Sequence, residues 1–181
     1  MIFNVNKTAE QYEDVKLFGN GDVGLLDTVN KRFPKIFDLY KEMKQLDWDE
    51  LEFDFSQCLI DFEKAPQDVT EMMIKTIMWQ WESDSVASQC PAVLIAPYEP
   101  CTEQWEAELR INDNESVHGN CYSEIVRMGF PVPQDVLKKM LAHNEAHRRL
   151  QVVGRELKKL KQKSILLAYK KEFEGYVPTQ E

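Results

Sequence analysis

Glu115, His118 and Tyr122 have the types and the spacing of a metal or redox centre. If their segment is helical, they lie one and two turns apart, so a carboxylate, an imidazole and a phenol share one stripe. Ile111 and Ile125 continue this stripe with aliphatic side chains, which predicts that it faces the protein interior. A buried carboxylate beside a histidine needs a compensating charge, and a metal ion is a common one. A single Glu-x-x-His also occurs on helix surfaces or as a satisfied core histidine, so the motif alone leaves its role open.

Asp84 is a further carboxylate on the apolar side of a predicted helix. Pro66 lies where the first turn of this helix would begin, and apolar residues such as Ile77 and Trp81 continue it at helical spacing to about Ser88. Because Asp84 lies one turn beyond Trp81, it also requires a partner. A helix cap or an ion pair would serve as well as a metal, so the position of Asp84 alone leaves both roles open.

The rest of the chain is also typical of helices and contains only seven glycines. Thr102 is a suitable N-cap for the helix that carries Glu115. The expected helices cover 27–45, 56–63, 66–88, 102–128 and 134–172, with a proline-bounded loop at 91–100. We therefore predict an all-α protein with a single helical domain over 1–181, in which 1–26 is an extended N-terminal arm and 27–181 is part of a helical bundle.

Composition limits the environment and the partners of the chain. The net charge of −9 argues against nucleic-acid binding, because no basic stripe is available to neutralise phosphates. No apolar run approaches the length of a membrane span. The cysteines are widely spaced, contain no Cys-x-x-Cys pair and follow no secretory signal, which predicts reduced thiols in a cytoplasmic protein. They are Cys58, Cys90, Cys101 and Cys121.

Asp84 on one helix and Glu115-x-x-His118 on the next form half of the ligand pattern of a di-metal carboxylate bundle. The segments Glu82-Ser-Asp84-Ser85 and Glu115-Ser-Val-His118, with Tyr122 one turn later and Trp48 upstream, resemble the small, radical-generating subunit of class I ribonucleotide reductase. The resemblance extends from the N-terminal Ile2-Phe-Asn-Val-Asn6 through at least Arg149. It implies a ferritin-like, di-metal carboxylate helical bundle that is incomplete in this chain.

The resemblance also implies a role for each residue of the motif. Asp84, Glu115 and His118 would be ligands of the first iron of a di-iron-oxo centre, although manganese suits the same ligands. Tyr122 would hold the stable radical, and Trp48 would begin radical transfer towards the catalytic large subunit. Members of the family are dimers of the small subunit.

The chain departs from the family pattern after Arg149. The family has a further carboxylate and a second Glu-x-x-His on two later helices, and neither occurs before Glu181. The cluster of His143, Glu145 and His147 does not replace them, because a two-residue step places side chains on different faces of a helix. We expect that cluster to be exposed polar surface.

Two functions follow from this departure. The first is a part of the radical-generating small subunit, a component of a ribonucleoside-diphosphate reductase that supports the reduction of ribonucleotides to deoxyribonucleotides. A complementary C-terminal small-subunit polypeptide would then complete the site, since an open apolar groove seldom stays uncovered. The alternative is a non-catalytic helical interaction or regulatory protein derived from this family. A stand-alone di-iron oxidase would need ligands that this chain lacks.

Overall fold

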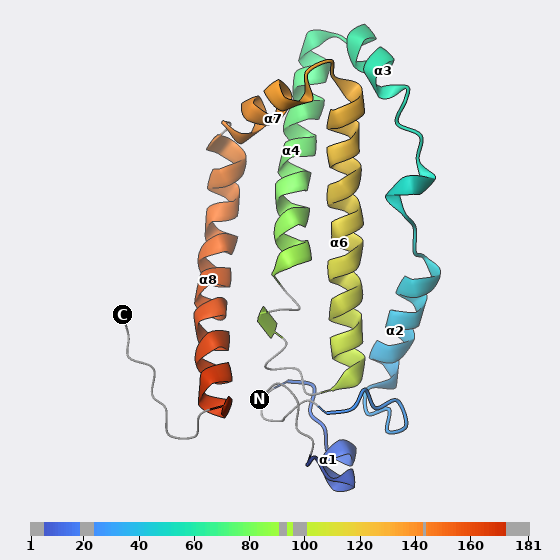
Figure 1. Cartoon of the computed structure of the whole chain (residues 1–181), viewed down its shortest axis with the longest axis vertical. Coiled ribbons are helices and arrows are strands. Elements are labelled where there is room, and N and C mark those ends of the chain that lie inside the picture. The colour runs from blue at the N-terminus through green and yellow to red at the C-terminus, as the bar shows by residue number, and fades with distance from the viewer. Residues whose placement is uncertain (1–5, 19–23, 91–93, 96–100, 143, 173–181) are drawn as a thin grey trace. The chain divides into compact units, whose positions relative to one another are not determined.

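The computed structural model describes residues 6–18, 24–90, 94–95, 101–142 and 144–172, and their side chains except those of 144, 146, 147 and 164–172 (Figure 1). Within these residues the regular structure is helical and contains no strand, which confirms the predicted all-α class for them. The elements are α1 Ala9–Glu13, α2 Pro34–Gln45, the 3-10 turn η1 Glu50–Glu52, α3 Cys58–Lys64, α4 Gln67–Gln89, α6 Thr102–Gly129, α7 Pro133–Leu141 and α8 Asn144–Glu172.

The chain groups into two compact units. The first unit comprises Met1–Leu46, Cys90–Asn112 and Arg155–Glu181, and the second unit comprises Asp47–Gln89 and Asp113–Gly154. Helices α6 and α8 each contribute residues to both units. The single domain expected over 1–181 stays a prediction. Every residue that the sequence indicates as a site residue belongs to the second unit.

The core of the second unit lies where α4, α6 and α7 meet. Ile77 and Met78 from α4, Val126 from α6 and Met140 from α7 are all buried and in contact. Because earlier residues of α4 pack on later residues of α6, the two helices run antiparallel, as Figure 1 shows. This packing fixes the register between the helices and brings the last turns of α4 beside the beginning of the second-unit part of α6.

Met78 provides a test of this core. Met78 is 3% exposed, so the Met78→Ala chain is expected to lose about 2–5 kcal/mol of unfolding free energy through lost burial and the cavity that remains. Urea denaturation of the two chains measures the difference. Met72 on the same helix is 61% exposed, and Met72→Ala is the matched control, with an expected change within about 0.5 kcal/mol. Equal effects of the two substitutions would contradict the observed core.

Gly129 allows α3 to approach the end of α6. A Cβ at Gly129 would lie 2.7 Å from Cδ2 of Phe62, which is closer than carbon atoms pack. The Phe62 ring in turn packs against Phe130, with ring centroids 4.6 Å apart. Since α3 follows the segment that carries Trp48, this close approach anchors the C-terminal end of that segment in the second unit.

In the first unit, the beginning of α6 is bound to the chain that precedes α2. The backbone N–H of Asp27 donates to Oγ1 of Thr102 at 2.9 Å, and the N–H of Phe33 donates to Oε1 of Glu103 at 3.0 Å. Glu103 is almost fully buried, so this hydrogen bond offsets part of the cost of removing its carboxylate from water. Thr102, predicted as the cap of α6, is its first residue and binds another part of the chain with its hydroxyl.

Two predictions for the N-terminal region were wrong in part. The helix expected from 27 begins only at Pro34, because Oδ1 of Asp27 instead accepts the N–H groups of Val29 and Asn30 at 2.8 and 3.2 Å in a local turn. The arm predicted at 1–26 is not extended throughout, because it contains α1, whose first turn is capped by Thr8 and Gln11.

The single helix expected over 134–172 was also wrong, because α7 and α8 are separate. Helix α7 ends at Leu141, and the N–H of the following residue, Ala142, donates a hydrogen bond to the carbonyl of Lys138. Buried Met140 and its neighbour Val136 hold α7 on the core of the second unit. The sequence has neither a proline nor a glycine between α7 and the start of α8, so no helix-breaking residue type indicates this break.

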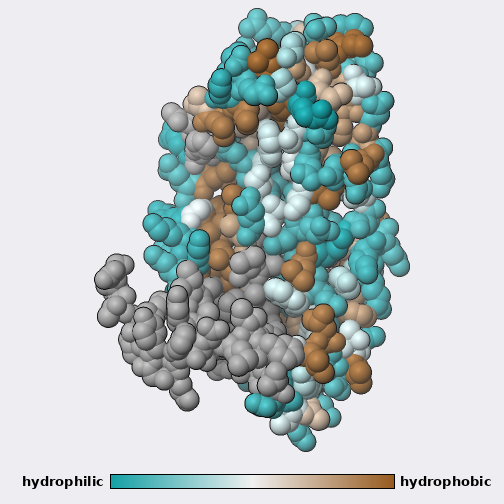
Figure 2. Space-filling view, viewed as in Figure 1, coloured by the Kyte–Doolittle hydropathy of each residue, from teal (hydrophilic) through white to brown (hydrophobic). Residues whose placement is uncertain are grey.

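The surface mixes apolar and hydrophilic residues, as Figure 2 shows for one face. The exposed large apolar side chains of the second unit include Leu51, Met72, Val132 and Leu141. All four cysteines are free thiols. Among the helices of the described residues, none is long and apolar enough to cross a membrane.

Candidate metal centre

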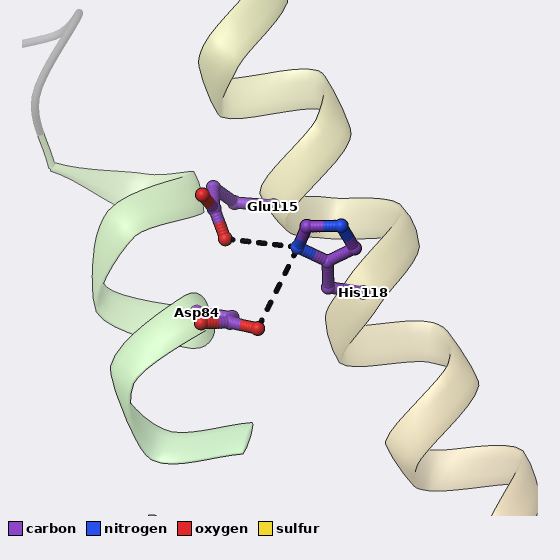
Figure 3. Close-up of side chains that lie close together, drawn as sticks. All are labelled: Asp84, Glu115 and His118. Carbon is purple, nitrogen blue, oxygen red and sulfur yellow. Dashed lines mark hydrogen bonds and ion pairs between the residues drawn. The ribbon is translucent and has the colours of Figure 1, made fainter. Parts of the chain in front are cut away.

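The structure brings together the three residues indicated as metal ligands. Asp84 extends from α4, and Glu115 and His118 extend from successive turns of α6 (Figure 3). Nδ1 of His118 lies 3.2 Å from Oε2 of Glu115 and 3.6 Å from Oδ2 of Asp84. One potential ligand atom from each residue lies within 4.8 Å of the others. We call these three residues the acid–histidine cluster.

The acid–histidine cluster is half-buried, so the prediction of a buried stripe was wrong in degree. The exposed side-chain fractions are 20% for Asp84, 25% for Glu115 and 35% for His118. Ile111, expected to continue the buried stripe, is 39% exposed. Trp48 stacks on His118, yet all three side chains of the cluster remain partly exposed. The cluster therefore keeps an open side.

Burial raises the pKa of the Asp84 carboxyl, and the nearby Glu115 carboxylate raises it further. A hydrogen bond from the Tyr122 hydroxyl and the proximity of His118 act in the opposite direction but do not cancel the increase in pKa. Two carboxylates this close repel one another, and a bound cation would relieve the repulsion.

The geometry fits a divalent cation. Neighbouring ligands at about 2.1 Å from one octahedral ion lie about 3 Å apart. The 3.2 and 3.6 Å separations of the acid–histidine cluster are close to that value. Two hard carboxylates and one imidazole suit iron or manganese. The same three groups could instead form an ion-pair cluster without metal when His118 is protonated, so their arrangement has two chemical interpretations.

Tyr122 joins the acid–histidine cluster to the hydrophobic core. Its hydroxyl is hydrogen-bonded to Asp84, and its ring packs against the core around Met78 and Val126. Burial, together with the carboxylates of Asp84 and Glu115, raises the pKa of the Tyr122 phenol to about 12. The phenol therefore remains protonated at neutral pH.

Trp48 contacts the acid–histidine cluster through His118. Its ring stacks on the His118 ring with centroids 5.4 Å apart and an interplanar angle of 29°. The ring of Phe53 meets the same indole edge-on, with centroids 5.3 Å apart. The indole thus contacts both an imidazole ring and a phenyl ring, and the residue indicated as a radical-transfer site touches the indicated ligand directly.

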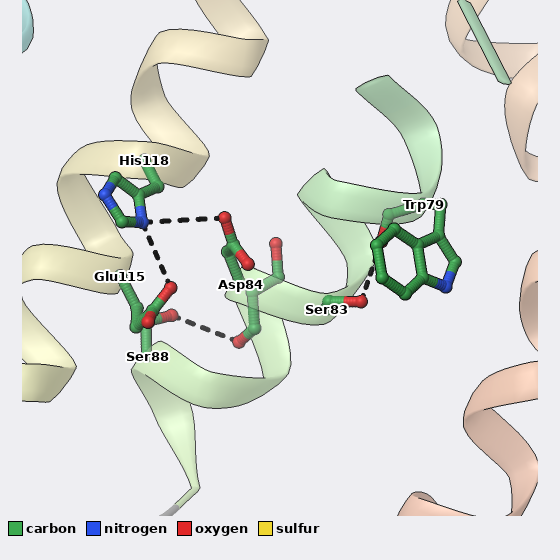
Figure 4. Close-up of polar contacts among 7 residues, drawn as sticks. Trp79, Ser83, Asp84, Ser88, Glu115 and His118 are labelled. Atoms are coloured by element: carbon green, nitrogen blue, oxygen red, sulfur yellow. Dashed lines mark hydrogen bonds and ion pairs between the residues drawn. The ribbon is translucent and has the colours of Figure 1, made fainter. Parts of the chain in front are cut away.

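The serine hydroxyls near Asp84 are used within α4. Oγ of Ser83 donates to the carbonyl of Trp79 at 2.8 Å, and Oγ of Ser88 donates to the carbonyl of Ser85 at 3.1 Å (Figure 4). Such bonds to the preceding turn are common for serine in helices. Asp84 is the residue of α4 that belongs to the acid–histidine cluster.

The side chains of His143 and His147 lie outside the described residues. Between them, Glu145 is exposed and lies 3.8 Å from a guanidinium nitrogen of Arg148 and 3.7 Å from one of Arg149. These contacts agree with the exposed polar surface expected at Glu145.

One contact near the acid–histidine cluster has no counterpart in the sequence analysis. Nδ2 of Asn120 donates to Oε1 of Glu50 at 2.7 Å, across 70 positions of sequence. Local periodicity contains no signal for such a pair. Asn120 lies between His118 and Tyr122 in sequence but on a different side of α6, so the metal motif does not indicate it either.

No protein-family model matches the chain, and the search of curated proteins finds no sequence that matches it. Function must therefore be inferred from the acid–histidine cluster and the aromatic residues around it.

Proposed function

We propose that the chain is part of the radical-generating small subunit of a ribonucleotide reductase, and that it supports the reduction of ribonucleotides to deoxyribonucleotides in the cytoplasm. The observation that carries this proposal is a continuous series of contacts. Tyr122 is hydrogen-bonded to Asp84, Asp84 lies beside His118, and the His118 ring stacks on Trp48. These contacts connect, in space and in this order, an oxidisable phenol, a potential metal site and an oxidisable indole.

In this proposal Asp84, Glu115 and His118 hold iron, or manganese, in a ferritin-like bundle. The chemistry that the bound metal would supply is its reaction with oxygen, which would oxidise Tyr122. The chain itself contributes the surroundings of the phenol. Asp84 accepts the hydrogen bond from the hydroxyl, and the core around Met78 shields part of the ring from water, which favours a persistent radical.

Trp48 is suited to carry an electron between the acid–histidine cluster and a partner protein. Its indole is half-buried, so one face lies against His118 while part of the ring reaches the surface. In this proposal that surface faces the large subunit of the reductase, where the substrate is reduced. The small subunit would act as a dimer, as in the family that the sequence resembles.

A second polypeptide completes the site in this proposal. A di-metal carboxylate bundle needs a carboxylate from each of two helices and a Glu-x-x-His from each of two others. Among the described residues, one cluster of three or more potential ligands occurs, and it supplies one carboxylate and one Glu-x-x-His. The open side of that cluster is where further ligands would approach.

A non-catalytic interaction protein derived from the same family is the second candidate. The observation that favours it is the exposure of large apolar side chains in the second unit, for example Leu51 and Met72. In such a protein, Asp84, Glu115 and protonated His118 would form a structural ion-pair cluster. Metal content separates the two candidates.

The decisive experiment combines this chain with the polypeptide that carries a second Glu-x-x-His. The copurified pair is loaded anaerobically with ferrous iron, exposed to air, and measured for bound iron and for an electron paramagnetic resonance signal. We expect two irons per pair and a tyrosyl signal, with little iron and no signal from this chain alone. Two irons and a radical on the isolated chain would contradict the need for a second polypeptide, and a metal-free pair would favour the interaction protein.

A further inference from the structure

The segment from Trp48 to Phe53 lies along α6 in the second unit, in a register defined by separate contacts. Trp48 stacks on His118, and Glu50 accepts a hydrogen bond from Asn120 at 2.7 Å. The carboxylate of Glu50 also contributes to the raised pKa of the Cys121 thiol, after the larger effect of burial. Two residues of this segment, Trp48 and Glu50, are therefore matched to two residues of α6, His118 and Asn120.

The segment is internally stiff, so a contact at Glu50 constrains Trp48. Oδ1 of Asp49 accepts the N–H of Leu51 at 2.8 Å, and Oε1 of Glu52 accepts the N–H of Asp49 at 3.1 Å. Together these bonds form a capping box around η1. Because η1 begins two residues after Trp48, the position of Glu50 relative to the indole is fixed by this short turn.

We propose that Glu50 and Asn120 are positioning residues, and that their hydrogen bond holds the Trp48 indole against the His118 ring. The bond joins residues 70 positions apart, and a side-chain pair of this kind fixes a register that backbone propensity cannot. Without it, the stacking on His118 and the contact with Phe53 would have to hold the half-buried indole unaided, and we expect them to be too weak to do so. That the fixed indole serves electron transfer rests on the proposed function, whereas the positioning itself does not.

Fluorine nuclear magnetic resonance of the whole chain labelled with 5-fluorotryptophan tests the positioning. The chain has four tryptophans, and Trp48→Phe assigns the resonance of Trp48. In the Asn120→Ala chain we expect this resonance to move towards that of free 5-fluorotryptophan, because the ring is released from the imidazole and phenyl rings. The other three resonances are expected to stay in place. An unmoved Trp48 resonance would overturn the proposal.

Matched variants separate the hydrogen bond from general destabilisation. Arg127→Ala removes an exposed ion pair with Glu124 further along α6, and we expect it to leave the Trp48 resonance unchanged. Asn120→Asp places two carboxylates together and should release the indole. Adding Glu50→Gln to Asn120→Asp restores a donor and an acceptor in the opposite direction, so the double variant should recover the wild-type resonance. Failure of this recovery would count against a hydrogen-bonded pair.

A second measurement addresses electron transfer in the completed enzyme. There, Asn120→Ala should leave the yield of tyrosyl radical unchanged and lower turnover on the order of 10- to 100-fold, since small misplacements cost about this much. A moved resonance with full turnover would overturn a role of the pair in transfer. If the wild-type complex shows no turnover, the proposed function fails, while the resonance of the isolated chain still decides the positioning.

Discussion

The Asp84→Asn chain is expected to bind divalent metal on the order of 100-fold more weakly than the wild type, or worse. Loss of a group that merely orients a ligand already costs about 10- to 100-fold in metal affinity, and Asp84 is a direct ligand in the proposed centre. Its Oδ2 lies 3.6 Å from Nδ1 of His118. Titration with ferrous iron under anaerobic conditions, against a competing chelator, measures the change. The titration uses the chain together with its complementing polypeptide.

Asp135→Asn is the matched control for this titration. Asp135 is an exposed carboxylate on α7 that lies 3.4 Å from Nζ of Lys138, well suited to report the general effect of removing one negative charge. We expect its metal affinity to remain within about 2-fold of wild type, because exposed charges are strongly screened. An equal loss in both variants would show that Asp84 is not a ligand.

The Asp84→Asn substitution should also stabilise the metal-free chain at neutral pH. The pKa of Asp84 is raised in the folded state, so ionisation of this carboxyl opposes folding, and stability is lost as the pH rises through that pKa. Asparagine removes the charge and can still accept the Tyr122 hydrogen bond. We expect a gain of about 0.5–1 kcal/mol at neutral pH, as for other destabilising functional groups, and a smaller difference in acid.

This change in stability distinguishes the two interpretations of the acid–histidine cluster. A metal centre deprived of its ion contains carboxylates that repel one another, so removing one of them relieves strain. A structural ion pair between Asp84 and protonated His118 would instead be weakened by the substitution. Thermal unfolding of the metal-free wild type and Asp84→Asn chains therefore gives opposite signs for the two interpretations.

Local patterns sufficed to predict the helices that carry the ligands. The bounds of the expected helices at 66–88 and 102–128 differ from those of α4 and α6 by no more than one residue at each end. Apolar spacing, Pro66 and Thr102 are all signals contained within a few residues. The start of α2 and the break before α8 were not predicted, because a turn around Asp27 sets the first and no proline or glycine marks the second.

The same distinction applies to the candidate site. The position of Glu115 and His118 on one face of a helix follows from their spacing, and the pairing with Asp84 followed from a resemblance. The exposure of the acid–histidine cluster and the contact between Glu50 and Asn120 depend on how distant segments pack. No period along one helix contains that information. Sequence therefore indicates the reactive groups better than the residues that position them.

The Tyr122→Phe chain, combined with its complementing polypeptide, is expected to bind iron normally and to show no tyrosyl radical. Phenylalanine keeps the ring that packs on the core and removes the hydroxyl that is hydrogen-bonded to Asp84. The expected loss of unfolding free energy is only about 1 kcal/mol, the typical net contribution of one hydrogen bond. Iron analysis and electron paramagnetic resonance of the same air-exposed sample measure both properties.

Tyr12→Phe is the control that gives this prediction its specificity. Tyr12 is also a tyrosine whose hydroxyl is hydrogen-bonded, to the backbone N–H of Leu25, but it lies in the first unit. Its substitution should preserve the radical signal in amount and in shape. A signal that persists in Tyr122→Phe would place the radical on another residue. Loss of the signal in Tyr122→Phe alone would show that the phenol beside Asp84 is the residue oxidised, because iron binding and folding are then unchanged.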